Sequence, residues 1–136
     1  MMTYEETVTK IVNSIDDVID IATGEAAAIF LAEFSDRVFN KGLTAKETSI
    51  GRYSEAYAEV RKQYGLQTTY VDLTFTTDLF RSIVQDKNTV IFKNEYGQDI
   101  SAENERIFKK KIFEPSDKER EIAIEVMTKE VNKLFE

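Results

Sequence analysis

The chain of 136 residues contains no cysteine, no histidine and no tryptophan. Without cysteine it can form no disulfide, no thiol nucleophile and no thiolate metal site. Without histidine it lacks the side chain that most often acts as a general base near neutral pH and as a metal ligand. A Ser-His-Asp or Cys-His catalytic site is therefore excluded, and a zinc site would consist of carboxylates alone, which is uncommon.

Glycine and long apolar runs are also scarce. The five glycines form neither a G-x-G-x-x-G nor a G-x-x-x-x-G-K pattern, so no phosphate-binding loop is predicted. The longest purely apolar run, residues 26–32, is far shorter than the roughly 20 residues of a membrane-spanning helix. Glu5 and Glu6 stand where a secretory signal would be basic. We expect a cytoplasmic protein that binds no membrane.

Carboxylate chemistry remains open, because the chain has 25 acidic residues. A glycosidase needs only two carboxylates at a defined separation, and the sequence neither excludes nor indicates such a pair. Asp16, Asp17 and Asp20 fall within about one helical turn and could bind a hard cation, but no calcium-loop pattern surrounds them. We assign no catalytic, cofactor-binding or metal-binding residue, and we expect a protein that is not an enzyme and uses no cofactor.

Negative charge is concentrated near the N-terminus. Residues 1–36 contain eight acidic residues and one basic residue, a net charge of −7, while the remaining 100 residues are balanced. This distribution argues against general nucleic-acid binding, which needs a basic surface. It is typical of a solvated helix face that keeps a protein soluble.

Apolar periodicity predicts long helices at both ends of the chain. Thr3 and Glu6 have the form of a capping box at the first helix start, and residues 40–42 (Asn-Lys-Gly) end it in the usual way. Residues 23–24 (Thr-Gly) are expected to break or bend this helix. Its apolar stripe has the spacing of one helix face. The stripe consists of Val8, Ile11, Val12, Ile15, Val18, Ile19 and Ala22.

The C-terminal helix is predicted to begin after Ser116, with Glu119 as its capping-box partner. Its expected apolar face consists of Ile122, Ile124, Val126, Met127, Val131 and Leu134. Residues 26–34 of the first helix are apolar almost all round, so we expect them in the core or in a subunit contact.

The middle of the chain mixes strands with short helices. Strict alternation over residues 70–76 predicts a half-buried strand, and a second strand is expected at 89–93, with one or two helical turns from 77–78 between them. Two strands alone are marginal. Either further strands lie in residues 43–50 and 82–86, or the sheet lies flat on the long helices.

A short helix is expected from Ser54, its cap, to about Tyr64. An aromatic stripe along this helix is interpreted as packing and not as a cofactor site. It consists of Tyr53, Tyr57, Val60 and Tyr64. Loops are expected at residues 42–51 and 94–101, and a further helix at 102–110.

The expected architecture is a single α+β domain over residues 1–136, with more helix than strand. Long N-terminal helices and a C-terminal helix pack on a small, mainly antiparallel sheet. Residues 1–41 form an acidic helical part, and residues 42–136 form the body.

Lys109, Lys110 and Lys111 form the one basic run, with Phe113 close by. Lysines are favourable at the C-terminal end of a helix, and alternating cations and aromatics also bind nucleic acid. Another alternative is contact with an acidic surface, which residues 1–36 of a second copy provide. Copies with one acidic and one basic patch can pack head to tail and close into a ring. The candidate assembly contacts are Lys109, Lys110, Lys111, Phe113, Asp16, Asp17 and Asp20.

Scattered blocks in residues 48–136 resemble a phage family. Residues 50–57 read IGRYSEAY and are followed by Arg61, residues 71–83 read VDLTFTTDLFRSI, and residues 111–116 read KIFEPS. These blocks resemble the phage tail-completion proteins, also called virion morphogenesis or head–tail joining proteins. Members often show a vdLT-x-x-G-d-(L/M)-x-x-S-(I/L) signature and an R-x-I-F element. This chain has Thr77 in place of the usual Gly and Lys111 in place of the usual Arg.

The resemblance implies a structural role in the virion, at the neck or tail, after passage through the host cytoplasm. Several copies would form a ring beside the tail-terminator or connector proteins, and an acidic lumen would let DNA pass without specific binding. Residues 70–80 would form the rigid body, and loops 42–51 and 94–101 the adaptable contacts. We expect the N-terminal helix and loop 42–51 to order on assembly.

The alternative function is a small acidic binding module, such as an inhibitor or immunity-type protein that blocks a basic protein partner. The acidic N-terminal third supports it, because charge steering speeds association. A version that mimics DNA would need carboxylates spaced like phosphates along one face, whereas much of that segment must belong to the core.

Overall fold

A computed structural model describes residues 3–74 and 76–135 of the chain. The elements in order are α1 (Tyr4–Ser35), the π-helical turn η1 (Asp36–Asn40), α2 (Glu55–Gln63), α3 (Asp78–Ser82), β1 (Ile83–Asp86), β2 (Thr89–Phe92), α4 (Glu95–Phe108), α5 (Asp117–Asn132) and the 3-10 turn η2 (Lys133–Phe135). The predicted α+β fold class, with long terminal helices and a small antiparallel sheet, is confirmed. Within the described ranges, no helix combines the length and the hydropathy needed to cross a membrane.

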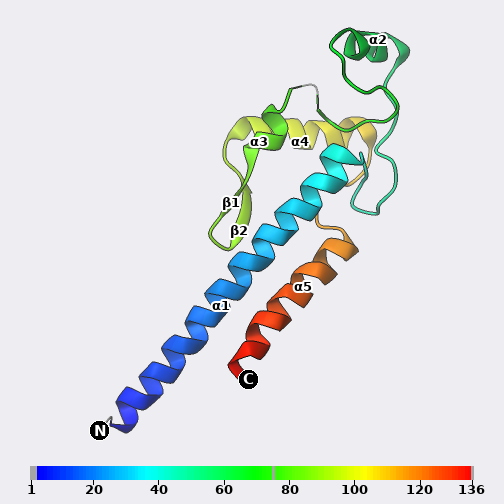
Figure 1. Cartoon of the computed structure of the whole chain (residues 1–136). Coiled ribbons are helices and arrows are strands. Elements are labelled where there is room, and N and C mark those ends of the chain that lie inside the picture. Colours follow the sequence, from blue (N-terminus) through cyan, green and yellow to red (C-terminus); the bar gives the residue numbers. More distant parts are fainter. Residues whose placement is uncertain (1–2, 75, 136) are drawn as a thin grey trace.

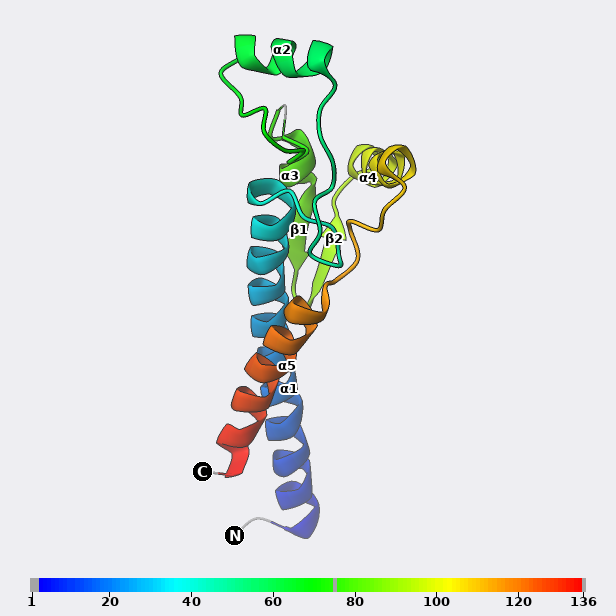
Figure 2. The ribbon, with the colours of Figure 1, turned by 90° about the vertical axis from the view of Figure 1, so that its right-hand side faces the viewer.

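Helix α1 runs along most of the molecule, with its N-terminus at one end and α2 at the other (Figure 1, Figure 2). The predicted capping box closes its start, since Glu6 N donates to Thr3 Oγ1 at 3.1 Å and Thr3 N donates to Glu6 Oε2 at 2.9 Å. The predicted break at residues 23–24 is wrong. The Gly24 carbonyl accepts a 2.9 Å hydrogen bond from Gln85 of the hairpin, so a tertiary contact supports the helix where its propensity is lowest.

The core lies at the C-terminal end of α1, where the chain turns back on itself. Phe34 and Val38 pack there against residues from the following loop and from the segment before α5. Loop 42–51 belongs to this core, because Ile50 is 1% exposed and Ala45 N donates to Lys111 O at 2.9 Å. Most of this loop is therefore anchored in the structure of the single chain, and only its tip, residues 46–49, is exposed.

Arg37 of η1 ties the two long helices together. Its guanidinium, 4% exposed, donates to both carboxylate oxygens of Glu119 at 2.5 and 3.2 Å. Three further bonds go to the backbone carbonyls of Leu43, Ile112 and Glu114 at 3.0 to 3.1 Å. Paired guanidinium and carboxylate groups with additional hydrogen bonds are the form in which a buried charge is tolerated.

Helix α5 runs antiparallel to α1 and lies beside it (Figure 1, Figure 2). Its predicted capping box at Ser116 is confirmed, and Glu119 of that box is the partner of Arg37. One and two turns farther on, Ala123 and Met127 point the same way and face α1. Ile124 is consequently turned outward and 62% exposed, so its assignment to the apolar face is wrong; the side chain of Leu134 lies outside what the structure describes.

The sheet is one antiparallel hairpin, β1–β2, paired from Ile83–Phe92 to Asp86–Thr89. It lies along α1 (Figure 2). The expected strand at 89–93 is thus confirmed, and its partner is the strand that the sequence offered at 82–86. Residues 43–50 contribute only the isolated Leu43–Ser49 bridge.

The predicted strand at residues 70–76 is wrong, although Phe75 lies outside the described residues. Neighbours Val71 and Asp72 are both buried, at 1% and 6% exposure, which alternation in a strand forbids. Leu73 then adopts a left-handed φ of 57°. The cause is Arg61, which draws the Asp72 carboxylate inward.

The predicted loop at 94–101 is also wrong, because these residues form the first half of α4. Asn94, and not Ser101, caps the helix by accepting a bond from Gly97 N at 3.0 Å. A Cβ on Gly97 would collide with the Ser82 side chain, so the glycine lets α4 approach α3 closely. The predicted short helix at 77–78 is confirmed as α3.

Replacement of Arg37 by methionine (Arg37→Met) is expected to lower the free energy of unfolding by about 3 to 5 kcal/mol, because Glu119 is left buried and unpaired. Arg106→Met, which removes the exposed ion pair with Glu103, is the matched control and should cost at most about 1 kcal/mol. Urea unfolding followed by circular dichroism measures both. Equal losses in the two variants would contradict the structural role of Arg37.

Candidate functional site

A second buried ion pair lies between α2 and the segment that follows it. Arg61 is 1% exposed, and its guanidinium donates to Gln67 O at 2.9 Å, Thr74 O at 3.0 Å and Asp72 Oδ1 at 3.3 Å. The same group lies over the ring of Tyr53, 4.3 Å from the centroid, in cation–π geometry.

Asp72 is saturated with hydrogen bonds. It accepts from Thr74 N at 3.0 Å, from Thr74 Oγ1 at 2.7 Å, from Gln67 Nε2 at 2.9 Å and from Tyr53 OH at 3.1 Å, besides the bond from Arg61. Four of these five bonds go to Oδ1 and one goes to Oδ2. The cluster therefore fixes the carboxylate and holds the chain in place.

The pKa of Tyr53 in this cluster is displaced. Burial raises the pKa of its phenol to about 12, and the nearby Asp72 carboxylate acts in the same direction. The phenol therefore stays neutral near neutral pH, where it accepts a bond from Asp72 N at 3.1 Å. The uncharged phenol donates one hydrogen bond and accepts another, so it helps to hold the cluster together and is a weak nucleophile.

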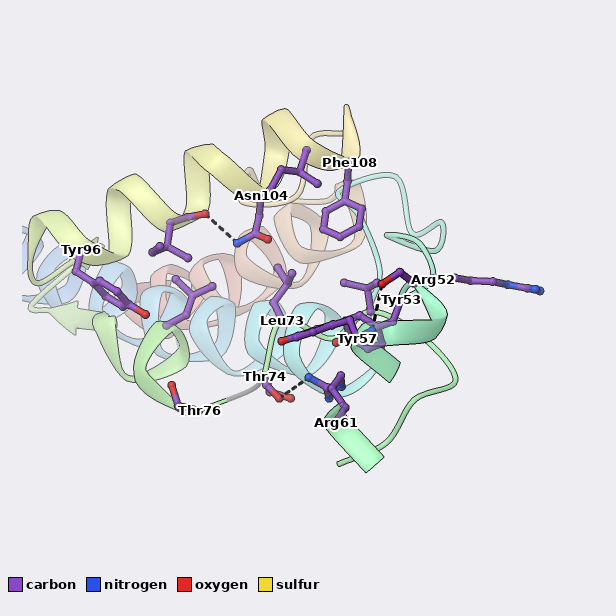
Figure 3. Close-up of a pocket in the computed structure, with 15 residues that line it drawn as sticks. Arg52, Tyr53, Tyr57, Arg61, Leu73, Thr74, Thr76, Tyr96, Asn104 and Phe108 are labelled. Carbon is purple, nitrogen blue, oxygen red and sulfur yellow. Dashed lines mark hydrogen bonds between the residues drawn. The ribbon is translucent and has the colours of Figure 1, made fainter. Parts of the chain in front are cut away.

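Above this cluster, α2 and α4 form the walls of a groove with a volume of about 470 Å³. Figure 3 shows Tyr53, Tyr57 and Arg61 on one wall and Tyr96, Asn104 and Phe108 on the other, with Leu73 between them. Most of the lining is aromatic or aliphatic. Two arginines line the groove, and none of its described lining residues is acidic. A concave and mostly apolar surface of this kind suits binding.

Sequence reasoning missed this groove. It interpreted Tyr53 and Tyr57 as packing, which agrees with the edge-to-face contact of their rings at 5.3 Å. It did not foresee that Tyr57 is also 39% exposed at the groove wall. It also placed Tyr96 in a loop, although α4 presents it to the groove. The usable signal was Arg61, an arginine that falls between Tyr57 and Tyr64 in the predicted short helix.

The N-terminal half of α1 is the second candidate surface. Its apolar stripe, defined here as Val8, Ile11, Val12, Ile15 and Ile19, is 40–55% exposed at every position. A shallow hollow on this half of α1 is lined by Ile11 and Ile15 of the stripe. Among its described lining residues, Phe135 of η2 is the one from outside α1. This half of the predicted stripe therefore lies outside the core, whereas Ala22 is buried.

The candidate assembly contacts fall at separate places. Asp16, Asp17 and Asp20 are exposed on α1, and among the described residues no group of three acidic side chains is arranged to hold a metal ion. Residues 109–111 follow α4, near the C-terminal end of α1 (Figure 1). One chain does not bring the acidic and basic sets together.

The basic run is not equally free at its three positions. All three lysines are exposed, but Lys110 Nζ also donates to Ser49 O at 2.8 Å and to Ile50 O at 3.2 Å. Phe113 is half-buried, with its ring 6.2 Å from that of Phe34. Its ring contributes to the core, and the exposed lysines are the side chains open to a partner.

No family model, curated protein or solved structure matches the chain. The likeness to tail-completion proteins rests on the sequence blocks themselves. Two of these blocks meet in the structure, since Arg61 binds Asp72 and Thr74 of the VDLT segment.

Alkaline pH should destabilise the protein through Tyr53. Its pKa rises from an ordinary 10.0 to about 12 on folding, so its contribution to stability is complete below pH 10 and is lost as the pH rises toward 12. Tyr53→Phe cannot ionise, so relative to its own stability at neutral pH it should lose less over this interval. Urea unfolding at a series of pH values tests this, with Tyr4→Phe, at an 84% exposed tyrosine, as control; identical alkaline losses in wild type and Tyr53→Phe would refute it.

Proposed function

We propose that the protein is a non-enzymatic structural protein of a tailed phage, which joins or completes the tail at the head–tail interface by packing against copies of itself and against neighbouring tail-terminator or connector proteins. The observation that carries this proposal is the uncovered apolar stripe on the N-terminal half of α1. The sequence blocks that resemble tail-completion proteins supply the phage setting.

The stripe is too large to be explained as scattered surface hydrophobicity. Five branched aliphatic side chains follow one another along a single face, each about half exposed, and contiguous apolar patches mark interaction surfaces. Burial of the remaining exposed area is worth roughly 1 kcal/mol for each side chain. The five side chains together supply roughly 5 kcal/mol, which matches only the lower end of the roughly 4 to 15 kcal/mol that association costs. A partner must therefore cover the whole stripe and add contacts of its own.

The direction of the acidic side chains favours assembly over the alternative of an acidic inhibitor. On the helix, Asp17 and Asp20 lie on the side opposite to Ile15 and Ile19. A basic partner held by these carboxylates would leave the stripe exposed to water. A partner that covers the stripe leaves Asp17 and Asp20 in solvent, where they keep the assembly soluble.

Ile11→Asp combined with Ile15→Asp is expected to weaken self-association of the full chain at least about tenfold, a loss of about 1.4 kcal/mol, because charge enters the apolar contact. Thr9→Asp with Asn13→Asp adds the same charge to the opposite face of α1 and should associate like the wild type. Sedimentation velocity measures both, and circular dichroism checks that α1 stays helical. Loss of association in the control alone, or in neither variant, would contradict the role of the stripe.

Phage particles purified on a density gradient from the source culture are expected to contain the chain at a few copies per particle, as measured by quantitative mass spectrometry. This result follows from a ring at the neck or tail. Detection of its peptides in the soluble cell fraction but not in the purified particles would contradict the phage assignment. Pull-downs for a basic partner would then be the next step.

A further inference from the structure

We propose that the groove between α2 and α4 receives the N-terminal half of α1 from a second copy of the chain. This inference rests on the proposed self-assembly and names the two surfaces that meet. The occupant is the helical segment of residues 4–19, with its apolar stripe directed into the groove.

The two surfaces cannot meet within one chain. The groove lies at the end of the molecule where α1 finishes, and the stripe lies at the end where α1 begins (Figure 1, Figure 2). With 32 residues, α1 is roughly 48 Å long at about 1.5 Å per residue. A straight helix therefore holds its own stripe away from its own groove, so a stripe that enters this groove must come from another copy.

The groove has the chemistry that an amphipathic helix requires. Tyr57, Tyr96 and Ile107 on its walls are 39%, 50% and 55% exposed, and so offer apolar area that the single chain leaves in water. A helix that lies in such a groove inserts side chains at spacings of three, four and seven residues. The stripe supplies them at Val8, Ile11 or Val12, Ile15 and Ile19.

Charge also matches between the two surfaces. Residues 4–19 have four carboxylates against one lysine, and two of the four, Glu5 and Asp16, border the stripe on the helix surface. Arg52 lines the edge of the groove and is exposed, with its side chain extended outward (Figure 3). The acidic residue Glu103 of α4 forms an ion pair with Arg106, so its charge is balanced within α4.

Charge argues against the obvious competing occupant, a second stripe. Two N-terminal helix halves packed on each other would bring together two segments that each have a net negative charge. Like charges across a contact weaken it. A groove with the exposed Arg52 at its edge and no acidic residue among its described lining is the better partner for an acidic helix.

The contact is heterologous, because the two surfaces differ and lie at opposite ends of each copy. Contacts of this kind propagate from copy to copy and either close into a ring or continue as a filament. A symmetric pair of stripes would stop at a dimer. The geometry therefore links this contact to assemblies of several copies.

The test is complementation between two variants of the full chain. The stripe variant (Ile11→Asp with Ile15→Asp) keeps an intact groove, and the groove variant (Tyr96→Asp with Ile107→Asp) keeps an intact stripe. Each should be monomeric alone, since one side of every contact is lost. An equimolar mixture should form a 1:1 dimer and nothing larger, as measured by sedimentation velocity.

A matched control accompanies the groove variant. Gln98→Asp with Ala102→Asp places the same charge on the opposite face of α4 and should associate like the wild type. If the wild type associates but the mixture stays monomeric, or if the groove variant associates normally, the inference is overturned while self-assembly stands. A wild-type chain that remains monomeric overturns the contact between free copies, and the particle measurement then decides the proposed function separately.

Cysteine cross-linking covers the case in which the aspartate variants fold poorly. The chain has no cysteine of its own, so Ile15→Cys and Ile107→Cys introduce single thiols at half-exposed positions. Mild oxidation of the mixed proteins should give a disulfide heterodimer, and Ile15→Cys mixed with Gln98→Cys should not. Preferential Ile15→Cys homodimers would show stripe against stripe and overturn the inference.

Discussion

The rest of the structure depends on the buried contact between Arg37 and Glu119. The guanidinium satisfies one carboxylate and three backbone carbonyls, so the end of α1, the loop after it and the segment before α5 must all converge on it. Glu119 also sets which face of α5 meets α1, and Ala123 and Met127 follow on that face. A buried charge tolerates few alternatives, because any other arrangement would leave it unpaired.

The Arg61–Asp72 pair does the same for the opposite end of the molecule. It overrides the alternating pattern of residues 70–76, since a buried carboxylate in need of partners outweighs the preference of this segment for a strand. By drawing that segment under α2, it creates the floor of the groove between α2 and α4. The groove lining is consequently mostly apolar around a guanidinium that is already paired with a carboxylate, which suits a binding surface.

The two surfaces of the proposed assembly follow from these constraints. Helix α5 starts where Glu119 meets Arg37, near the C-terminal end of α1. It has only 16 residues, whereas α1 has 32, so α5 covers only part of the length of α1. The N-terminal half of α1 is left with an apolar stripe that faces water, and the groove is left with exposed aromatic walls. The proposed assembly pairs this acidic helix with the groove at the opposite end of a second copy.

Local interactions are what the sequence determined by itself. The caps at Thr3, Ser54 and Ser116, the long first helix and the strand at 89–92 follow from contacts between residues a few positions apart. Tertiary structure alone decided that α1 continues through Gly24, that α4 begins at Asn94, that residues 71–74 leave the strand conformation and that Ile124 faces water. Periodicity shows which side chains favour burial but not which partner buries them. The groove and the exposed part of the stripe therefore depend on two tertiary ion pairs. Arg37 pairs with Glu119, 82 residues away along the chain, and Arg61 pairs with Asp72, 11 residues away.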